Sequence, residues 1–157
     1  MKGKTKMKKT NLTRVIALIA AICILSVIFV SCKKEESVNG YCTVVLGNAE
    51  QTAYTVNLDE VTVDNGLFSV LDYLKENESL TYACDASGFL TEVGDVKQDA
   101  AAGIYIYLYT SVAKDQDVSE YKTEQPYGDM TLVSSGVGAK DMTIEDGAVI
   151  YIGTVAW

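Results

Sequence analysis

The chain has 157 residues, of which 13 are basic, 21 are acidic and none is histidine, so its formal net charge is −8. Because histidine is the usual general base and a common zinc ligand, the composition argues against nucleophilic triads and zinc motifs. We therefore predict no enzyme activity, no metal site and no cofactor. The acidic balance also disfavours nucleic acid as a partner, since phosphate backbones bind basic surfaces.

The first 31 residues have the pattern of a lipoprotein signal peptide. Residues 1–14 carry six basic side chains and no acid, and residues 15–31 are uncharged and apolar. The small residues Val30 and Ser31 stand before Cys32, as in a lipobox, although Phe29 occupies a position where leucine is commonest. We predict that residues 1–31 are cleaved and that Cys32 carries lipid.

A second interpretation of the same segment is open. Residues 15–31 are 17 residues long, which is also within reach of a single membrane span. The basic n-region gives both interpretations one orientation. We expect a protein of the bacterial cell membrane whose domain lies on the extracytoplasmic side, held by lipid on Cys32 or by a retained span.

Cleavage before Cys32 would leave 126 residues, enough for one domain that buries about two-thirds of its unfolded surface. Residues 32–40 read as the lipidated cysteine and a polar tether, and residues 41–157 as the domain. The leader holds six of the 13 basic residues and none of the 21 acidic ones, so the remaining net charge is −14. Solubility of an exported domain is sufficient to explain this charge.

The first elements of the domain are predicted to be a hairpin and a helix. β-Branched residues in 41–47 and 52–63 indicate two strands joined by a polar turn. Leu67, Phe68, Leu71 and Leu74 then follow a helical period, which predicts a helix over 67–77. Asp64 or Asn65 is the expected N-cap.

The rest of the domain is predicted to be mostly strands. Short strands are expected at 80–84 and 88–94, a loop at 95–103 and a clear strand at 103–112. Residues 113–129 read as a long polar connection. Residues 130–157 close the chain, with Asp146-Gly147 as a tight turn into the last strand.

Hairpin, helix and further strands in this order predict an α+β fold, a β-grasp-like mixed sheet with one main helix. The hairpin, "LFSVLDYLKEN", "GFLTEVGDV", "GIYIYLYTSV" and "MTIEDGAVIYIG" resemble small exported domains related to the C-terminal β-grasp domain of transcobalamin and intrinsic factor. The resemblance covers most of residues 41–157. The family's Trp and Tyr-x-x-Asn-Gly element is replaced here by Tyr-Leu-Tyr-Thr-Ser at 107–111, so no ligand contacts are carried over.

Three tyrosines are the candidate ligand-binding residues. Tyr105, Tyr107 and Tyr109 alternate with Ile104, Ile106 and Leu108, which places their rings on one face of a strand. Such a face could stack a sugar or another planar ligand. Alternatively, the connection 110–130 or a neighbouring strand covers the rings, and they form a second small core.

Cys42 and Cys84 are the only cysteines left once Cys23 leaves with the leader and Cys32 is lipidated. They could form one disulfide in an exported protein, or each could be a small buried apolar residue. Two function hypotheses follow from the sequence. The first is a membrane-tethered module that binds a small ligand or a protein, and the second is a structural envelope lipoprotein that docks on a partner protein without a small ligand.

Overall fold

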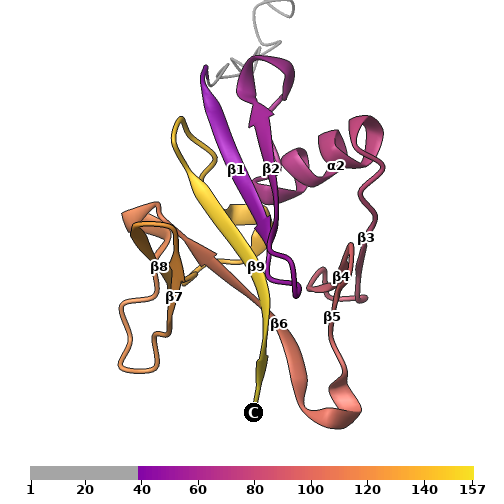
Figure 1. The fold of residues 1–157 in the computed structure, drawn as a ribbon, viewed down its shortest axis with the longest axis vertical. Coiled ribbons are helices and arrows are strands. Elements are labelled where there is room, and N and C mark those ends of the chain that lie inside the picture. The colour runs from indigo at the N-terminus through magenta and orange to yellow at the C-terminus, as the bar shows by residue number, and fades with distance from the viewer. Residues whose placement is uncertain (1–38) are drawn as a thin grey trace, which may run out of the picture. The chain divides into compact units, whose positions relative to one another are not determined.

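The computed structural model describes residues 39–157, which contain a six-stranded mixed sheet, a three-stranded sheet and one α-helix (Figure 1). The helix is α2 (Leu67–Asn77), and the strands are β1 (Tyr41–Leu46), β2 (Thr52–Asn57), β3 (Tyr82–Cys84), β4 (Leu90–Val93), β5 (Val96–Lys97), β6 (Ile104–Thr110), β7 (Glu124–Tyr127), β8 (Met130–Ser134) and β9 (Val149–Ala156). The α+β class with one helix and a mixed sheet is thereby confirmed for these residues.

The large sheet has the strand order β2-β1-β9-β6-β8-β7, and the small sheet has the order β3-β4-β5. All pairings are antiparallel except that of β1 with β9, which is parallel. The first and last strands therefore lie side by side inside the large sheet, and β9 and β6 are its two central strands. The first predicted hairpin is β1–β2, with a continuous register from Tyr41 opposite Asn57 to Leu46 opposite Thr52.

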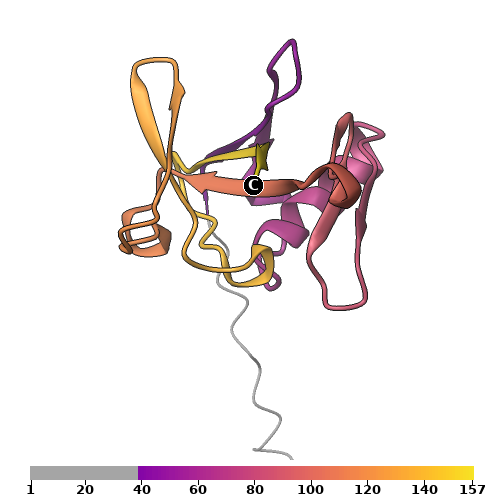
Figure 2. The same ribbon diagram turned by 90° about the horizontal axis from the view of Figure 1, so that it is seen from below.

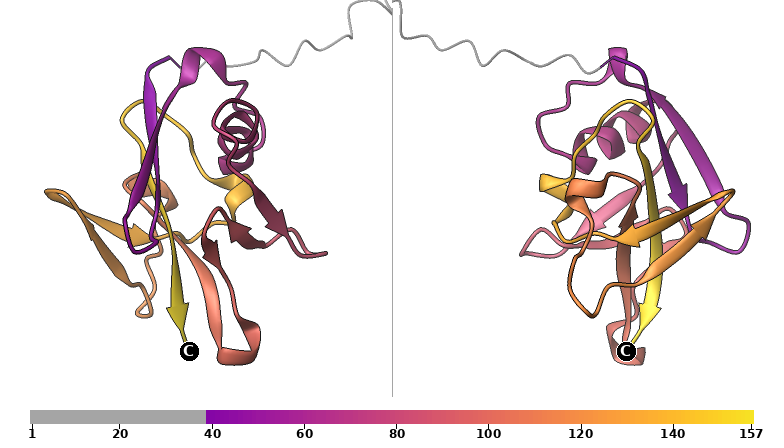
Figure 3. Two further views of the ribbon diagram at one scale, coloured as in Figure 1. Left: turned by 45° about the vertical axis from the view of Figure 1, so that its right-hand side comes forward. Right: turned by 90° about the vertical axis from the view of Figure 1, so that its left-hand side faces the viewer.

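The main core lies between the large sheet and α2, on the side where the small sheet also packs (Figure 3). The apolar stripe of α2 is buried there, as its helical period predicts. Its members meet alternate residues of β1 and β9, such as Val44 and Ile150. Because all of this core comes from residues after Tyr41, we expect residues 33–157 to fold without the leader.

The opposite face of the large sheet has a second, smaller core. Val45 and Val149, which alternate with the residues of the main core, pack there against Tyr151, Tyr109 and Leu132. Figure 2 shows the β1–β2 and β7–β8 hairpins projecting from the side of the sheet away from α2. The alternation predicted for 103–112 is confirmed, because Ile106 and Leu108 pack against the main core whereas Tyr107 and Tyr109 join the second one.

The predicted cap of α2 is wrong. The N-cap is Gly66, with φ of +57° and no side-chain hydrogen bond. The hydroxyl of Ser69 instead accepts hydrogen bonds from the backbone N–H groups of Asp64 and Asn65, at 3.3 and 3.0 Å. Glycine is required at position 66 because its Cα lies against the carbonyl oxygens of Ala139 and Lys140, where a Cβ would sit 2.6 and 2.3 Å from them.

Two segments predicted as connections contain regular structure. Residues 95–103 include β5 and a short 3-10 helix, Ala100–Ala102, capped by the Asp99 carboxylate. Residues 113–129 include a 3-10 helix at Ala113–Asp115 and the edge strand β7. Neither segment has apolar periodicity. Strand β5 pairs with the preceding strand β4, and β7 pairs with the following strand β8, so pairing rather than an apolar pattern makes them strands.

The signal peptide predicted at 1–31, the lipidation site Cys32 and most of the tether 32–40 lie outside the described residues. Within 39–157, no helix has both the length and the apolar character needed to cross a membrane. The first strand of the described residues, β1, begins at Tyr41.

Candidate functional site

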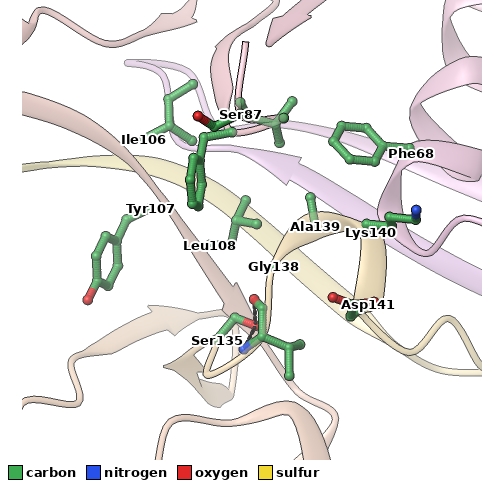
Figure 4. A pocket seen from close by; sticks show the side chains of 14 residues that line it. Phe68, Ser87, Ile106, Tyr107, Leu108, Ser135, Gly138, Ala139, Lys140 and Asp141 are labelled. Carbon is green, nitrogen blue, oxygen red and sulfur yellow. Dashed lines mark hydrogen bonds between the residues drawn. The ribbon is translucent and has the colours of Figure 1, made fainter. Parts of the chain in front are cut away.

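An open pocket of about 450 Å³ lies on the core side of the large sheet (Figure 4). Its floor is β6, and its walls are the β3–β4 turn, the first turn of α2, and the segment that follows β8. Apolar side chains dominate the lining, among them Phe68, Phe89, Ile106, Leu108 and Val137. A concave, mainly apolar site with polar groups at its rim is the usual form of a small-molecule site.

The β3–β4 turn holds Phe89 at the mouth of this pocket. The Asp85 carboxylate accepts hydrogen bonds from the backbone N–H groups of Ser87 and Phe89, at 2.8 and 3.0 Å. Gly88, with φ of +85°, completes the turn. Phe89 is 68% exposed, so a large apolar ring is held in water beside the pocket.

The opposite wall, residues 135–141, is fixed by a buried carboxylate. Asp115 is only 5% exposed, and its side chain accepts hydrogen bonds from the backbone N–H and the hydroxyl of Thr143. Its carbonyl oxygen accepts the N–H of Gly136 at 2.8 Å. These bonds hold both ends of the segment that carries Val137 and the rim residues Lys140 and Asp141.

Phe68 projects from α2 toward the pocket and is itself held by a neighbouring ring. Its centroid lies 5.9 Å from that of Tyr82 in a stacked arrangement. The Tyr82 hydroxyl donates to the Asp72 carboxylate at 2.7 Å. Burial, followed by this hydrogen bond, raises the pKa of Tyr82 to about 12.

The three candidate tyrosines do not form one uniform platform. Tyr109 is 6% exposed and belongs to the second core, where it contacts Tyr151 edge-on with the ring centroids 6.0 Å apart. Tyr107 is half-buried against Tyr109, and Tyr105 is 42% exposed. Figure 4 shows the Tyr107 ring directed away from Leu108 and the centre of the pocket.

Trp157 extends this aromatic surface in a way the sequence pattern did not indicate. Its ring lies 6.3 Å from that of Tyr107, and it is 74% exposed. The backbone N–H of Trp157 donates to the backbone carbonyl of Gly103, just beyond the last residue pair of β6 and β9, and this bond positions the residue. The exposed aromatic surface therefore consists of Tyr105, Tyr107 and Trp157, while Tyr109 is covered.

The disulfide between Cys42 and Cys84 is absent, and both thiols are free. Cys42 is buried under α2 in β1, whereas Cys84 is exposed in β3 of the small sheet. Burial raises the pKa of the Cys42 thiol to about 11, so this group stays protonated and is a poor nucleophile. Cys42 therefore acts as a small apolar core residue.

Of the three tyrosines predicted from the sequence as ligand contacts, only Tyr107 lines the pocket, and the other lining residues were not predicted. From the sequence pattern, Phe68, Ile106 and Leu108 are core positions of a helix and a strand. They line the pocket because the fold places them next to the β3–β4 turn. Phe89 follows the polar turn "DASG", and a phenylalanine at a turn was the one available signal. In residues 39–157, no group of three or more His, Cys, Asp or Glu side chains is placed to share a metal ion.

Comparisons with known proteins give structural similarity at low sequence identity. No known protein family matches the sequence, and no curated protein matches it. A crystal structure from Ruminococcus gnavus ATCC 29149, described as a candidate metal-binding protein, is similar with a TM-score of 0.47 and 13% identity. The match covers 76% of this chain and 99% of that chain. That description applies to the Ruminococcus protein alone.

Proposed function

We propose that the chain is a lipid-anchored, extracytoplasmic module of the bacterial cell envelope that binds a small ligand with an apolar body. The observation that carries the proposal is the open pocket of about 450 Å³ between β6, α2 and the β3–β4 turn. Two phenylalanines and several aliphatic side chains offer apolar contact, while Lys140 and Asp141 at the rim offer polar contacts. The chain contains no histidine, which favours binding over catalysis.

The rigidity of both walls supports a binding role. The Asp85 turn and the Asp115 hydrogen bonds fix Phe89 and Val137 before any ligand arrives. A site that is already ordered loses little conformational entropy on binding. An exposed phenylalanine is unfavourable in a free monomer, and a ligand that covers it would gain apolar contact.

The order of elements supports a β-grasp-like fold of the kind seen at the C-terminus of transcobalamin and intrinsic factor. A hairpin, one helix across a mixed sheet, and a final strand parallel to β1 are shared features of that arrangement. In those carriers the ligand lies between the β domain and a large helical domain. A β domain by itself offers at most half of such a site, whereas the pocket at Phe89 is formed within residues 39–157, so we propose a different ligand for it.

The pocket is tested by a thermal-shift screen of residues 33–157 against small apolar and amphipathic compounds. A ligand present at 100 times its Kd should stabilise the folded domain by about 2.7 kcal/mol, because it binds only that state. Phe89→Ala should weaken the stabilisation by that ligand. Tyr121→Ala is the control, because Tyr121 is equally exposed but lies outside the pocket. The proposal would be contradicted if the compound raised the melting temperature of Phe89→Ala and Tyr121→Ala equally, or if no compound stabilised the domain.

The anchor is tested separately with the full chain. If Cys32 is lipidated, Cys32→Ala should block lipid labelling and leave an unprocessed precursor that still begins near Met1. Each buried methylene of the lipid adds about 0.8 kcal/mol of membrane affinity, so two acyl chains suffice for stable anchoring. Intact-mass analysis of the membrane-extracted protein decides the question. A chain that retains residues 1–31 with an unmodified Cys32 would leave the single-span anchor as the correct reading.

An accessory envelope lipoprotein that docks on a partner protein is the second candidate function. The specific observation in its favour is the open edge of the large sheet at β2.

A further inference from the structure

The two edges of the large sheet differ in how well they are protected from other strands. The β7 edge carries Pro126, which has no N–H to donate, and the charged Glu124. The β2 edge, "TAYTVN", has no proline and no charged residue, and its register with β1 has no bulge. Proteins usually block such an edge, so an unblocked one is a site where another strand can pair.

The hydrogen bonds around β1 identify which groups of β2 are free. The N–H groups of Thr43 and Gly47 donate to β9 or the residue before it, and the N–H of Leu58 donates to Gly40. Residues with even numbers in β2 therefore face β1, and the N–H and C=O groups of Ala53, Thr55 and Asn57 point away from the sheet. Within residues 39–157, the N–H groups of these three residues have no hydrogen-bond partner.

We propose that the β2 edge binds an extended basic segment of a partner protein as a seventh strand of the large sheet. Main-chain hydrogen bonds to Ala53, Thr55 and Asn57 would supply affinity, as in other cases of strand addition. The small, exposed side chains of Ala53 and Thr55 leave room for an approaching backbone.

Charge decides between a partner segment and a second copy of this chain. The antiparallel pairing of two β2 strands that uses all three free residues places Thr55 opposite Thr55 of the other copy. In that register, Glu50 in the β1–β2 turn and Glu60 in the 3-10 helix Leu58–Glu60 lie just beyond the ends of β2, so both ends of the paired strands would carry acidic residues from both copies. Like charges in opposite positions are unfavourable, and the acidic domain adds further repulsion. A partner strand with Lys or Arg residues would instead be attracted to these acidic residues.

A polar cleft of about 370 Å³ next to β2 supports a basic partner. It is lined by Thr52 and Tyr54 of β2 and by three carboxylates, those of Glu78, Glu92 and Asp95. Glu92 is paired with Lys97 at 2.9 Å. Glu78 and Asp95 are exposed, and among residues 39–157 neither has an ion-pair partner. Side chains of an added strand on the same face as Tyr54 would be directed toward this cleft.

The probe for this proposal is the peptide acetyl-Thr-Val-Lys-Val-Lys-Val-Thr-amide, titrated against residues 33–157. On a strand, its two lysines lie on one face and its valines on the other. We expect binding that slows amide hydrogen exchange at Ala53, Thr55 and Asn57. The peptide with glutamate in place of both lysines should not bind, and added salt should weaken binding of the basic peptide.

Variants of Thr55 separate backbone pairing from side-chain contact. Thr55→Pro removes one outward N–H and should weaken binding about tenfold or more, because at least one hydrogen bond is lost. Thr55→Val keeps the N–H and should bind within about twofold of the wild type. The double change Glu78→Gln and Asp95→Asn should weaken binding severalfold, whereas Glu76→Gln outside the cleft should not.

Three results would overturn the proposal. The first is binding that Thr55→Pro leaves intact, and the second is exchange protection that falls outside β2. The third is dimerisation of the domain through β2 in analytical ultracentrifugation, which would make a second copy the occupant. If Thr55→Pro fails to fold, the exchange pattern of the wild type decides. Because this edge does not line the pocket at Phe89, failure here leaves the ligand proposal unaffected.

Discussion

Gly66→Ala should destabilise residues 33–157 by about 2 to 5 kcal/mol, measured by urea or thermal unfolding. Two costs add at this position. Alanine at the φ of +57° and ψ of −135° that Gly66 adopts, a conformation L residues rarely take, costs at least about 1 to 2 kcal/mol. In addition, its Cβ would lie 2.3 Å from the carbonyl oxygen of Lys140, so backbone must move, and overpacking typically costs about 1 to 3 kcal/mol.

Gly128→Ala is the matched control for this experiment. Gly128 has the same φ of +57°, but no atom lies within 4 Å of the position that a Cβ would take. It should therefore show only the conformational cost. Equal losses for the two variants would mean that α2 does not press on residues 139–140. The same variant of Gly66 should also weaken ligand binding in the pocket, because Ala139 and Lys140 form part of its wall.

Leu71→Ala should cost about 2 to 5 kcal/mol of unfolding free energy, since it removes a fully buried side chain and leaves a cavity between α2 and the large sheet. Leu74, which is 1% exposed, should give a loss in the same range. These losses are a large share of the stability of a small domain. Chemical denaturation of each variant, with CD as the readout, provides the measurement.

Glu76→Ala is the control for the leucine variants, because Glu76 is exposed on the same helix. Its effect should stay within about 0.5 kcal/mol. Losses of similar size for Leu71→Ala and Glu76→Ala would contradict the assignment of Leu71 to the core.

Local pattern was sufficient where one face of an element is buried along its whole length. Leu67, Leu71 and Leu74 repeat at the helical period because α2 lies flat on the sheet. Ile106 and Leu108 alternate with tyrosines because β6 crosses the middle of the same sheet. In both cases, one face of the element is buried along its length, so the apolar residues repeat with the period of the element.

Predictions from the sequence pattern were wrong or incomplete where the burial changes along one element or is set by another part of the chain. Tyr105 and Tyr109 have the same place in the alternation, yet only Tyr109 is covered, because β8 pairs with β6 at Tyr109 and Thr110 alone. Strand β7 has no alternation of apolar and polar residues and contains Pro126, so its own sequence does not mark it as a strand, although it pairs with the adjacent β8. Asp64 and Asn65 have favourable side chains for a cap, but the approach of residues 139–140 requires glycine where the helix begins.

The candidate pocket is also a feature that the local sequence pattern does not predict. Its residues come from β6, α2, the β3–β4 turn and the segment after β8, and no two of these segments are adjacent in the chain. Sequence reasoning can identify Phe89 as a large side chain at a turn, but the partners that make it part of a pocket are set by the tertiary fold.

The parallel pairing of β1 with β9 has a consequence for how the domain folds. These strands are about a hundred residues apart in sequence. In the sheet, β9 lies between the β1–β2 hairpin and β6 and pairs with both β1 and β6. Most of the large sheet therefore cannot assemble before residues 149–156 are available. Such long-range closure raises the contact order and slows folding. Until β9 arrives, β1 and β6 are exposed edges, so the chain is most vulnerable to aggregation and proteolysis during that interval.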